Sequence, residues 1–212
     1  MLKKIRNLDQ KDRTMYILRF TLTINIILAT IKYILAFTLT SMWFFVNALF
    51  LTVLSISRFF SIKDYKCIKL SRGNSENKKV GYKNYIRNGI LLILLGLMYF
   101  FISVYIYCKG TKTTMHEYLT YLVALNAFWS ISLAIYGMIK YKKANNPILK
   151  SVKMTNFANA LTSIVLTQVT LLDTFGPGYD LSKINSYTGM GVSIIIGLIG
   201  LSMIIGIKKI DY

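Results

Sequence analysis

The residues of this chain that could do chemistry are polar side chains placed inside long apolar segments. The segment from 151 to 172 carries the most, with Thr155, Asn159, Thr162 and Ser163 at spacings of one to four residues. These spacings put all four on one side of a helix. Hydroxyl and amide groups in that setting can line the path of a solute, or they can hydrogen-bond to neighbouring helices at about 0.6 to 2 kcal/mol per contact.

Two further polar residues lie in other apolar segments. Lys32 shares one helical face with Asn25, Ala29 and Ala36, and Asn47 lies in the next segment. A lysine at this depth either extends towards the outer headgroups or faces the interior of a helix bundle. The predicted substrate path therefore comprises Lys32, Asn47, Thr155, Asn159, Thr162 and Ser163.

Acidic side chains are absent from the middle of every apolar segment, because all eight Asp and Glu residues lie near segment ends or in connections. Zinc and manganese sites need carboxylate, imidazole or thiolate groups in a close cluster. A proton-coupled carrier usually needs a carboxylate or histidine within the membrane. Nucleophile-elbow, phosphate-loop and metalloprotease motifs are also missing from the sequence. We therefore expect no metal site, no cofactor and no enzymatic activity.

The elements that must position these residues are long apolar runs in a chain of 212 residues, 54% of them hydrophobic and 16% charged. Six runs of about 18 to 22 residues are each long enough to cross a hydrocarbon core about 30 Å thick. This predicts an all-α fold, a six-transmembrane-helix bundle with both termini cytoplasmic. The predicted helices cover 17–37, 42–62, 88–108, 117–139, 151–172 and 186–207. A basic N-terminal segment 1–16, a basic cytoplasmic loop 63–87 and a short tail 208–212 complete the chain.

Basic residues are concentrated on one side of these segments. In this arrangement 22 of the 26 Lys and Arg residues fall on the side of both termini, and three fall on the other side. Such asymmetry is typical of a cytoplasmic face and predicts a multi-pass protein of the cell (inner) membrane. Anionic headgroups explain the basic belt more simply than nucleic acid, for which the sequence has no motif. The expected headgroup contacts are Lys66, Lys69, Arg72, Lys78, Lys79, Lys142 and Lys143.

Small residues recur at helical spacing in two segments, at Gly89 and Gly96 and at Gly189, Ser193 and Gly197. Such stripes let helix backbones approach closely in lipid. We expect them to pack within one chain, and the alternative is a seam with a second copy or with a different membrane partner.

The approach to the second apolar segment carries a family resemblance. Asn25 and Lys32, followed by Thr40-Ser41, resemble the N…K…G-S approach found in the cation diffusion facilitator (cation efflux) family. Residues 46–54 then fall on that family's A-D-A-x-H/D-x-x-x-D pattern.

The resemblance continues in the last two segments. Residues 147–163 resemble the family's P-x-L-R-A-D-x-x-H-x-x-x-D-x-x-x-S pattern, and the segment opening at Asn185 resembles its sixth helix. The similarity covers about residues 15–207. It implies the family's six-helix plan, with a tight hairpin of the first two helices and a polar fifth helix.

The family's metal lies between its second and fifth helices on four side chains, and the matching positions here are Phe50, Leu54, Thr155 and Asn159. Two of these residues are apolar, and the other two are neutral and weak ligands for zinc. The family's C-terminal cytoplasmic domain is also expected to be absent. The resemblance therefore implies a divergent transporter that has lost the zinc/proton antiport site. The alternative is a non-transporting accessory or regulatory membrane protein on the same fold.

One structural feature discriminates between these two functions. A water-reachable cavity between the second and fifth helices favours transport. A space filled by Phe50 and Leu54 favours the non-transporting alternative.

Overall fold

The computed structural model describes residues 10–70, 74–110, 116–140, 147–176 and 181–208. Among these residues there are no strands and six α-helices, so the all-α prediction is confirmed. The helices are α2 (Gln10–Thr38), α3 (Met42–Leu70), α4 (Asn74–Lys109), α5 (Glu117–Lys140), α6 (Pro147–Phe175) and α7 (Ser182–Lys208).

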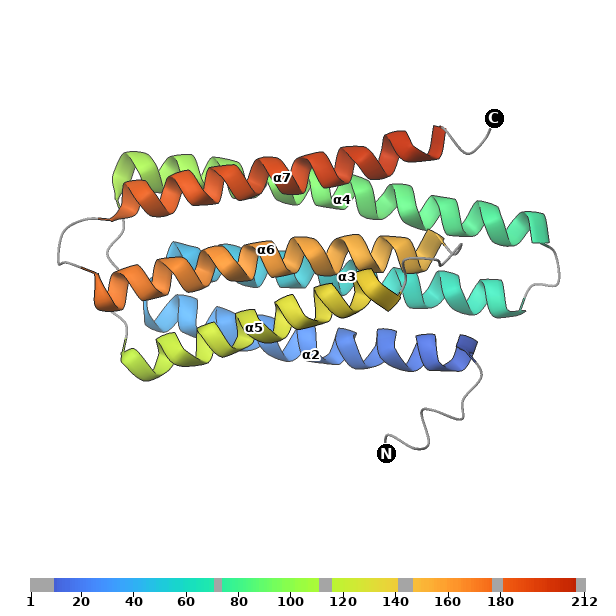
Figure 1. Ribbon diagram of the computed structural model, residues 1–212, viewed down its shortest axis with the longest axis horizontal. Helices are drawn as coiled ribbons and strands as arrows, with labels where there is room; N and C mark the ends of the chain where they lie inside the picture. The colour runs from blue at the N-terminus through green and yellow to red at the C-terminus, as the bar shows by residue number, and fades with distance from the viewer. Residues whose placement is uncertain (1–9, 71–73, 111–115, 141–146, 177–180, 209–212) are drawn as a thin grey trace.

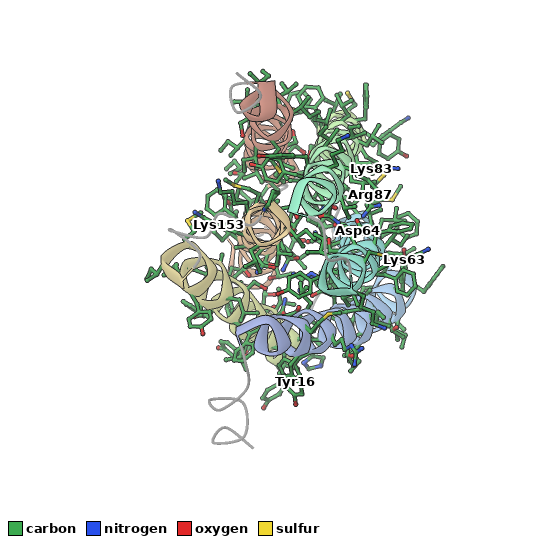
Figure 2. All side chains as sticks on the ribbon, turned by 90° about the vertical axis from the view of Figure 1, so that its right-hand side faces the viewer. Tyr16, Lys63, Asp64, Lys83, Arg87 and Lys153 are labelled. Atoms are coloured by element: carbon green, nitrogen blue, oxygen red, sulfur yellow. The ribbon has the colours of Figure 1, made fainter. Side chains whose placement is uncertain are left out.

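The helices run side by side, and α6 lies in the middle of the bundle (Figure 1). Viewed from one end, α6 is placed between the α4–α7 pair and helices α2, α3 and α5 (Figure 2). We call this the basic end, because Lys63, Lys83 and Lys153 lie there (Figure 2). Helix α2 begins and α7 ends at the basic end, and the opposite end is called the far end (Figure 1).

Five of these helices are long and apolar enough to cross a membrane, which supports the multi-pass prediction. Helix α6 is not among the five, because Thr, Ser, Asn and Gln interrupt its apolar residues. It contacts α3, α4, α5 and α7, and twelve of its residues are buried. Neighbouring helices therefore cover the hydroxyl residues of α6, among them Thr155, Thr162 and Ser163, while its amides Asn156, Asn159 and Gln168 are half-buried.

The cytoplasmic loop predicted for 63–87 differs from the structure. Helix α3 continues to Leu70 and α4 begins at Asn74. This extension is held by tertiary contacts, since Tyr65 is buried and a Cβ at Gly81 would meet the Pro147 ring at 3.3 Å. Polar composition alone indicated a loop, whereas packing against the start of α6 keeps these residues helical.

The predicted hairpin of the first two helices is present, with a very short turn. Thr40 has a φ of 48°, in the left-handed region that ends many helices. Ser41 occupies the N-cap position of α3, and its carbonyl accepts a hydrogen bond from the Phe45 N–H at 3.2 Å. The turn therefore sends α3 back along α2.

Three apolar clusters fill the bundle. The far-end cluster joins α2, α3, α4, α5 and α6 and contains Ala36, Trp43, Phe44, Val46, Tyr99, Ile106, Val123, Val165, Leu166 and Val169. The basic-end cluster joins α2, α3 and α6 through Leu18, Ile62 and Val152. The central cluster joins α3, α4, α6 and α7 and contains Phe50, Leu54, Leu92, Leu95, Ala158, Ile196 and Met203.

The glycine stripes lie between α4 and α7, within one chain. A Cβ at Gly96 would lie 3.0 Å from the Ser193 carbonyl oxygen, and one at Gly200 would lie 2.7 Å from the Gly89 carbonyl oxygen. Close backbone approach is the main way that helices gain packing energy in lipid. The α4–α7 contact therefore depends on glycine at these positions, where a side chain would not fit.

We expect Gly200→Ala to lower the free energy of unfolding by about 1–3 kcal/mol, because the added methyl group would meet backbone atoms that cannot move aside. Thermal unfolding of the purified protein in detergent measures this loss. Gly197→Ala is the matched control, since a Cβ there meets nothing within 4 Å. Equal stability of the two variants would contradict this account of the seam.

Candidate functional site

The two apolar residues at the family's metal positions lie in the central cluster. Phe50 is 1% exposed and Leu54 is 2% exposed. They pack with Ala158 of α6 and with Leu92 and Leu95 of α4. The space on this side of the α3–α6 contact is therefore filled by side chains.

The two polar residues at the family's metal positions make their hydrogen bonds within α6 or to α5. Asn159 extends towards α5, and its Nδ2 lies 3.5 Å from the Ser130 Oγ. The Thr155 hydroxyl donates to the Val152 carbonyl of its own helix at 3.0 Å. Helices α3 and α6 are neighbours, as the resemblance implies, but the Ala158 surface that touches Phe50 is not the surface that carries Asn159.

No group of three or more His, Cys, Asp or Glu residues that could hold a metal ion is found in the described part of the chain. At the four family positions only two side chains carry an oxygen or nitrogen, and those two bond within α6 or to α5. The arrangement does not fit a tetrahedral site of nitrogen and sulfur ligands.

A band of polar residues lies along the helices between the basic-end and far-end clusters. On α2 it follows Leu18 and precedes Ala36, and on α6 it follows Val152 and precedes Val165. We call this the interior polar band, and it comprises Asn25, Lys32, Ser55, Arg58, Ser130, Thr155, Asn156, Asn159, Thr162 and Ser163. Apolar side chains close it at both ends.

Among the described residues, Arg58 donates to Asn156 between α3 and α6, and the bonds of the band between α5 and α6 are long. Ser130 of α5 lies 3.5 Å from Asn159 Nδ2 and 3.5 Å from Ser163 Oγ, at the limit for a hydrogen bond. The Thr162 hydroxyl donates to the Asn159 carbonyl at 3.0 Å, within the same helix. Of the predicted substrate path, five residues lie in the band: Lys32, Thr155, Asn159, Thr162 and Ser163.

Asn47, the sixth residue of the predicted path, lies outside the band. Its side chain is 1% exposed, and Nδ2 donates to the Trp43 carbonyl at 2.9 Å. Its other neighbour is the Tyr99 hydroxyl on α4. Asn47 therefore belongs to the contact between α3 and α4.

Lys32 is buried in the interior, with 5% of its surface exposed, so the bundle-interior interpretation is the one the structure supports. Asn25 is equally buried, two turns earlier on the same face. On the same face, Leu18 belongs to the basic-end cluster with Ile62 of α3 and Val152 of α6, and Ala36 belongs to the far-end cluster.

Sequence reasoning missed a second polar region, at the basic end between α3, α4 and α6. Asn88 Nδ2 donates to Ser151 Oγ at 2.9 Å and to Asn84 Oδ1 at 2.9 Å, and Asn88 Oδ1 accepts from Ser57. Asn84 Nδ2 donates to Asp64 Oδ2 at 2.8 Å. We call this the basic-end network.

An ion pair continues the basic-end network towards the surface. Arg87 lies 2.8 Å from Asp64, and its guanidinium also stands 4.5 Å from the centre of the Phe60 ring. Asp64 and Arg87 come from neighbouring helices and face each other at this end (Figure 2). The hydrogen bonds of the basic-end network are therefore shorter than those that Ser130 makes in the interior polar band.

The sequence contains a pattern that indicates the basic-end network, but the pattern lies at the ends of the predicted apolar segments. Ser57 and Ser61, and likewise Asn84 and Asn88, are spaced by four residues and share one face of their helix. Since 63–87 was assigned to a loop, Asn84 had no predicted helix on which that spacing could be read.

A shallow groove of about 380 Å³ opens on the outer surface between α5 and α6. Its lining is almost wholly apolar and includes Phe128, Ile131, Ile164 and Leu171. The groove does not lie between α3 and α6, the two helices between which a cavity would favour transport.

The expected headgroup contacts are only partly described. Lys66 and Lys79 are exposed at the basic end. The side chains of Lys69 and Lys78, and the residues Arg72, Lys142 and Lys143, lie outside the described set.

Comparison with known proteins finds no matching family model and no matching curated protein.

We expect Asn88→Ala to lower the free energy of unfolding by about 1–3 kcal/mol, because it leaves Ser57, Asn84 and Ser151 without their shared partner. Asn126→Ala is the control, since Asn126 is half-buried and makes no hydrogen bond with described residues. Both variants are compared with wild type by thermal unfolding. An Asn88 variant as stable as the Asn126 variant would show that the network contributes nothing.

Zinc titration of the purified protein should reveal no tight stoichiometric site, because Phe50 and Leu54 carry no ligand atoms and Asn159 is directed to Ser130 of α5. Equilibrium dialysis measures the bound metal, with Asn159→Ala as the comparison. Sub-stoichiometric binding that is the same in both proteins is the expected result. One tightly bound zinc per chain, lost in the variant, would refute it.

Proposed function

We propose that this chain is a divergent membrane transporter for a solute other than a divalent transition-metal ion. The observation that carries the proposal is the interior polar band, which is enclosed by the basic-end cluster at one end and the far-end cluster at the other. A carrier holds its solute in such an enclosed polar site while both entrances are closed.

The loose hydrogen bonding of the band supports this function. A polar group that serves only stability is expected to be firmly bonded inside a membrane bundle, as Asn84 and Asn88 are. Asn159 and Ser163 instead share Ser130 at 3.5 Å. Groups held this weakly can exchange their partner for a solute at small cost.

The helix packing suggests which parts move. Helix α2 packs chiefly on α3, and α5 packs chiefly on α6, so each pair forms a hairpin. The polar band lies between the two hairpins. Opening one apolar cluster while the other stays closed would expose the band to each side in turn.

The turn before α3 supports the link to the cation efflux family. Thr40 occupies the position where the family's G-S motif has glycine, and its φ of 48° is a conformation that glycine adopts without strain. The four substituted ligand positions point to a different solute, and the family's zinc/proton antiport is not part of the proposal.

A second candidate function is a non-transporting accessory or regulatory membrane protein. Phe50 and Leu54 favour it, because they fill the space beside α3 and α6 and tie both helices to α4 and α7. In this second candidate the contact stays closed, so the bundle does not alternate between two open states.

Uptake into proteoliposomes tests the proposal. The purified full-length chain is offered small inorganic anions and cations, amino acids and sugars in parallel. We expect uptake of at least one solute above protein-free vesicles, and a loss of at least about tenfold in Thr162→Leu, which fills the band with a larger apolar side chain. Ser202→Leu is the control, because Ser202 is exposed on α7.

Two outcomes would overturn the transporter proposal. If no solute enters above background, the non-transporting candidate replaces it. If Thr162→Leu and Ser202→Leu transport equally well, the interior polar band is not the path.

A further inference from the structure

The interior polar band holds two cationic side chains and no acidic one. Lys32 is 5% exposed and Arg58 is 4% exposed. None of the eight Asp and Glu residues falls between 18 and 36 on α2, between 46 and 62 on α3, or between 152 and 165 on α6. The band therefore has a positive formal charge that its own residues do not balance.

Three of its hydrogen-bond donors also lack acceptors among the described residues. The Lys32 ammonium has no ion pair or hydrogen bond with any described residue. Asn25 Nδ2 and Arg58 Nε are fully buried and have no partner among the described residues. Arg58 reaches only the side-chain oxygen of Asn156, which is neutral.

Helix geometry brings two of these donors towards each other. Asn25 and Lys32 lie seven residues apart on one face, a rise of about 10 Å. Helical side chains lean towards the helix N-terminus, which directs the long lysine side chain towards Asn25. An ammonium and an amide N–H₂ can then face the same small volume.

An unpaired buried cation is costly in a membrane, and the cost falls when an anion accompanies it. Buried donors without acceptors make up the kind of lining that stabilises negative charge where water is excluded. The basic-end network would not bind an anion in this way, because its amide donors already have acceptors within the protein.

We infer that the interior polar band binds a small monovalent inorganic anion, held by Lys32 and Asn25. This rests on the proposed function and names its substrate class. One ammonium and one amide suit a single negative charge, and the apolar clusters above and below exclude large solutes. Lys32 lies between these clusters, so a lipid headgroup is not the source of the anion.

Equilibrium binding tests the inference without requiring transport. The full chain is placed in nanodiscs of zwitterionic phosphatidylcholine, and its thermal unfolding is followed as sodium gluconate is replaced by sodium chloride or sodium nitrate at constant ionic strength. We expect the unfolding midpoint to rise by several degrees and to saturate with chloride or nitrate, because the anion binds only the folded chain.

Variants of Lys32 show whether the anion-dependent rise in unfolding temperature comes from this site. Lys32→Gln should remove the anion-dependent rise, whereas Lys32→Arg should keep it because the charge remains. Lys83→Gln makes the same charge change at an exposed position and should behave as wild type. Lys32→Gln should also unfold in gluconate at no lower temperature than wild type, because it no longer buries an unpaired charge.

The outcomes separate this inference from the transporter proposal. No saturable rise with either anion in the wild type, or an equal rise in Lys32→Gln, overturns anion binding. Anion binding together with no uptake of any solute retains the site and supports the non-transporting candidate. Uptake of a cation without anion binding keeps the transporter proposal and refutes the substrate class.

Discussion

A helix that carries amides and hydroxyls along its length cannot face lipid, and this constraint organises the whole bundle around α6. Asn156, Asn159 and Gln168 would each cost several kcal/mol if they met hydrocarbon without a partner. Helices α3, α4, α5 and α7 surround α6 instead, and they supply partners such as Thr188, which accepts from Gln168 at 2.9 Å. The tight α2–α3 turn and the glycine seam of α4 and α7 allow the remaining helices to close around that centre.

Much of this fold could be predicted from residue periodicity. A helix lies at each of the six predicted apolar runs, although only five are apolar enough to cross a membrane, and Asn25 and Lys32 are both buried, as their shared face predicted. The ends of α3 and α4 could not be predicted from composition. Polar residues beyond the apolar core resemble a loop in the sequence, because the residues that they bond to are not known at that stage. Asn84, for example, bonds to Asp64 and Ser61 on another helix.

The candidate site was predictable only in part, for a geometric reason. Spacing along one helix gives the angle between its own side chains, but it does not give the rotation of that helix against its neighbours. Thr155, Thr162 and Ser163 are all buried on α6, as their spacing indicated. Phe50 and Leu54 were correctly placed on a neighbouring helix, yet they pack on Ala158 and not beside Asn159, which bonds to α5.

The packing of Phe50 and Leu54 bears on whether a metal site could be built between α3 and α6. Histidine or aspartate at these two positions would place ionisable groups among Leu92, Leu95 and Ile196. A working chelate would also need α3 turned about its own axis, and so a rebuilt contact with α4 and α7. Building such a site therefore demands coordinated change in three helices, which point mutations at Phe50 and Leu54 alone would not supply.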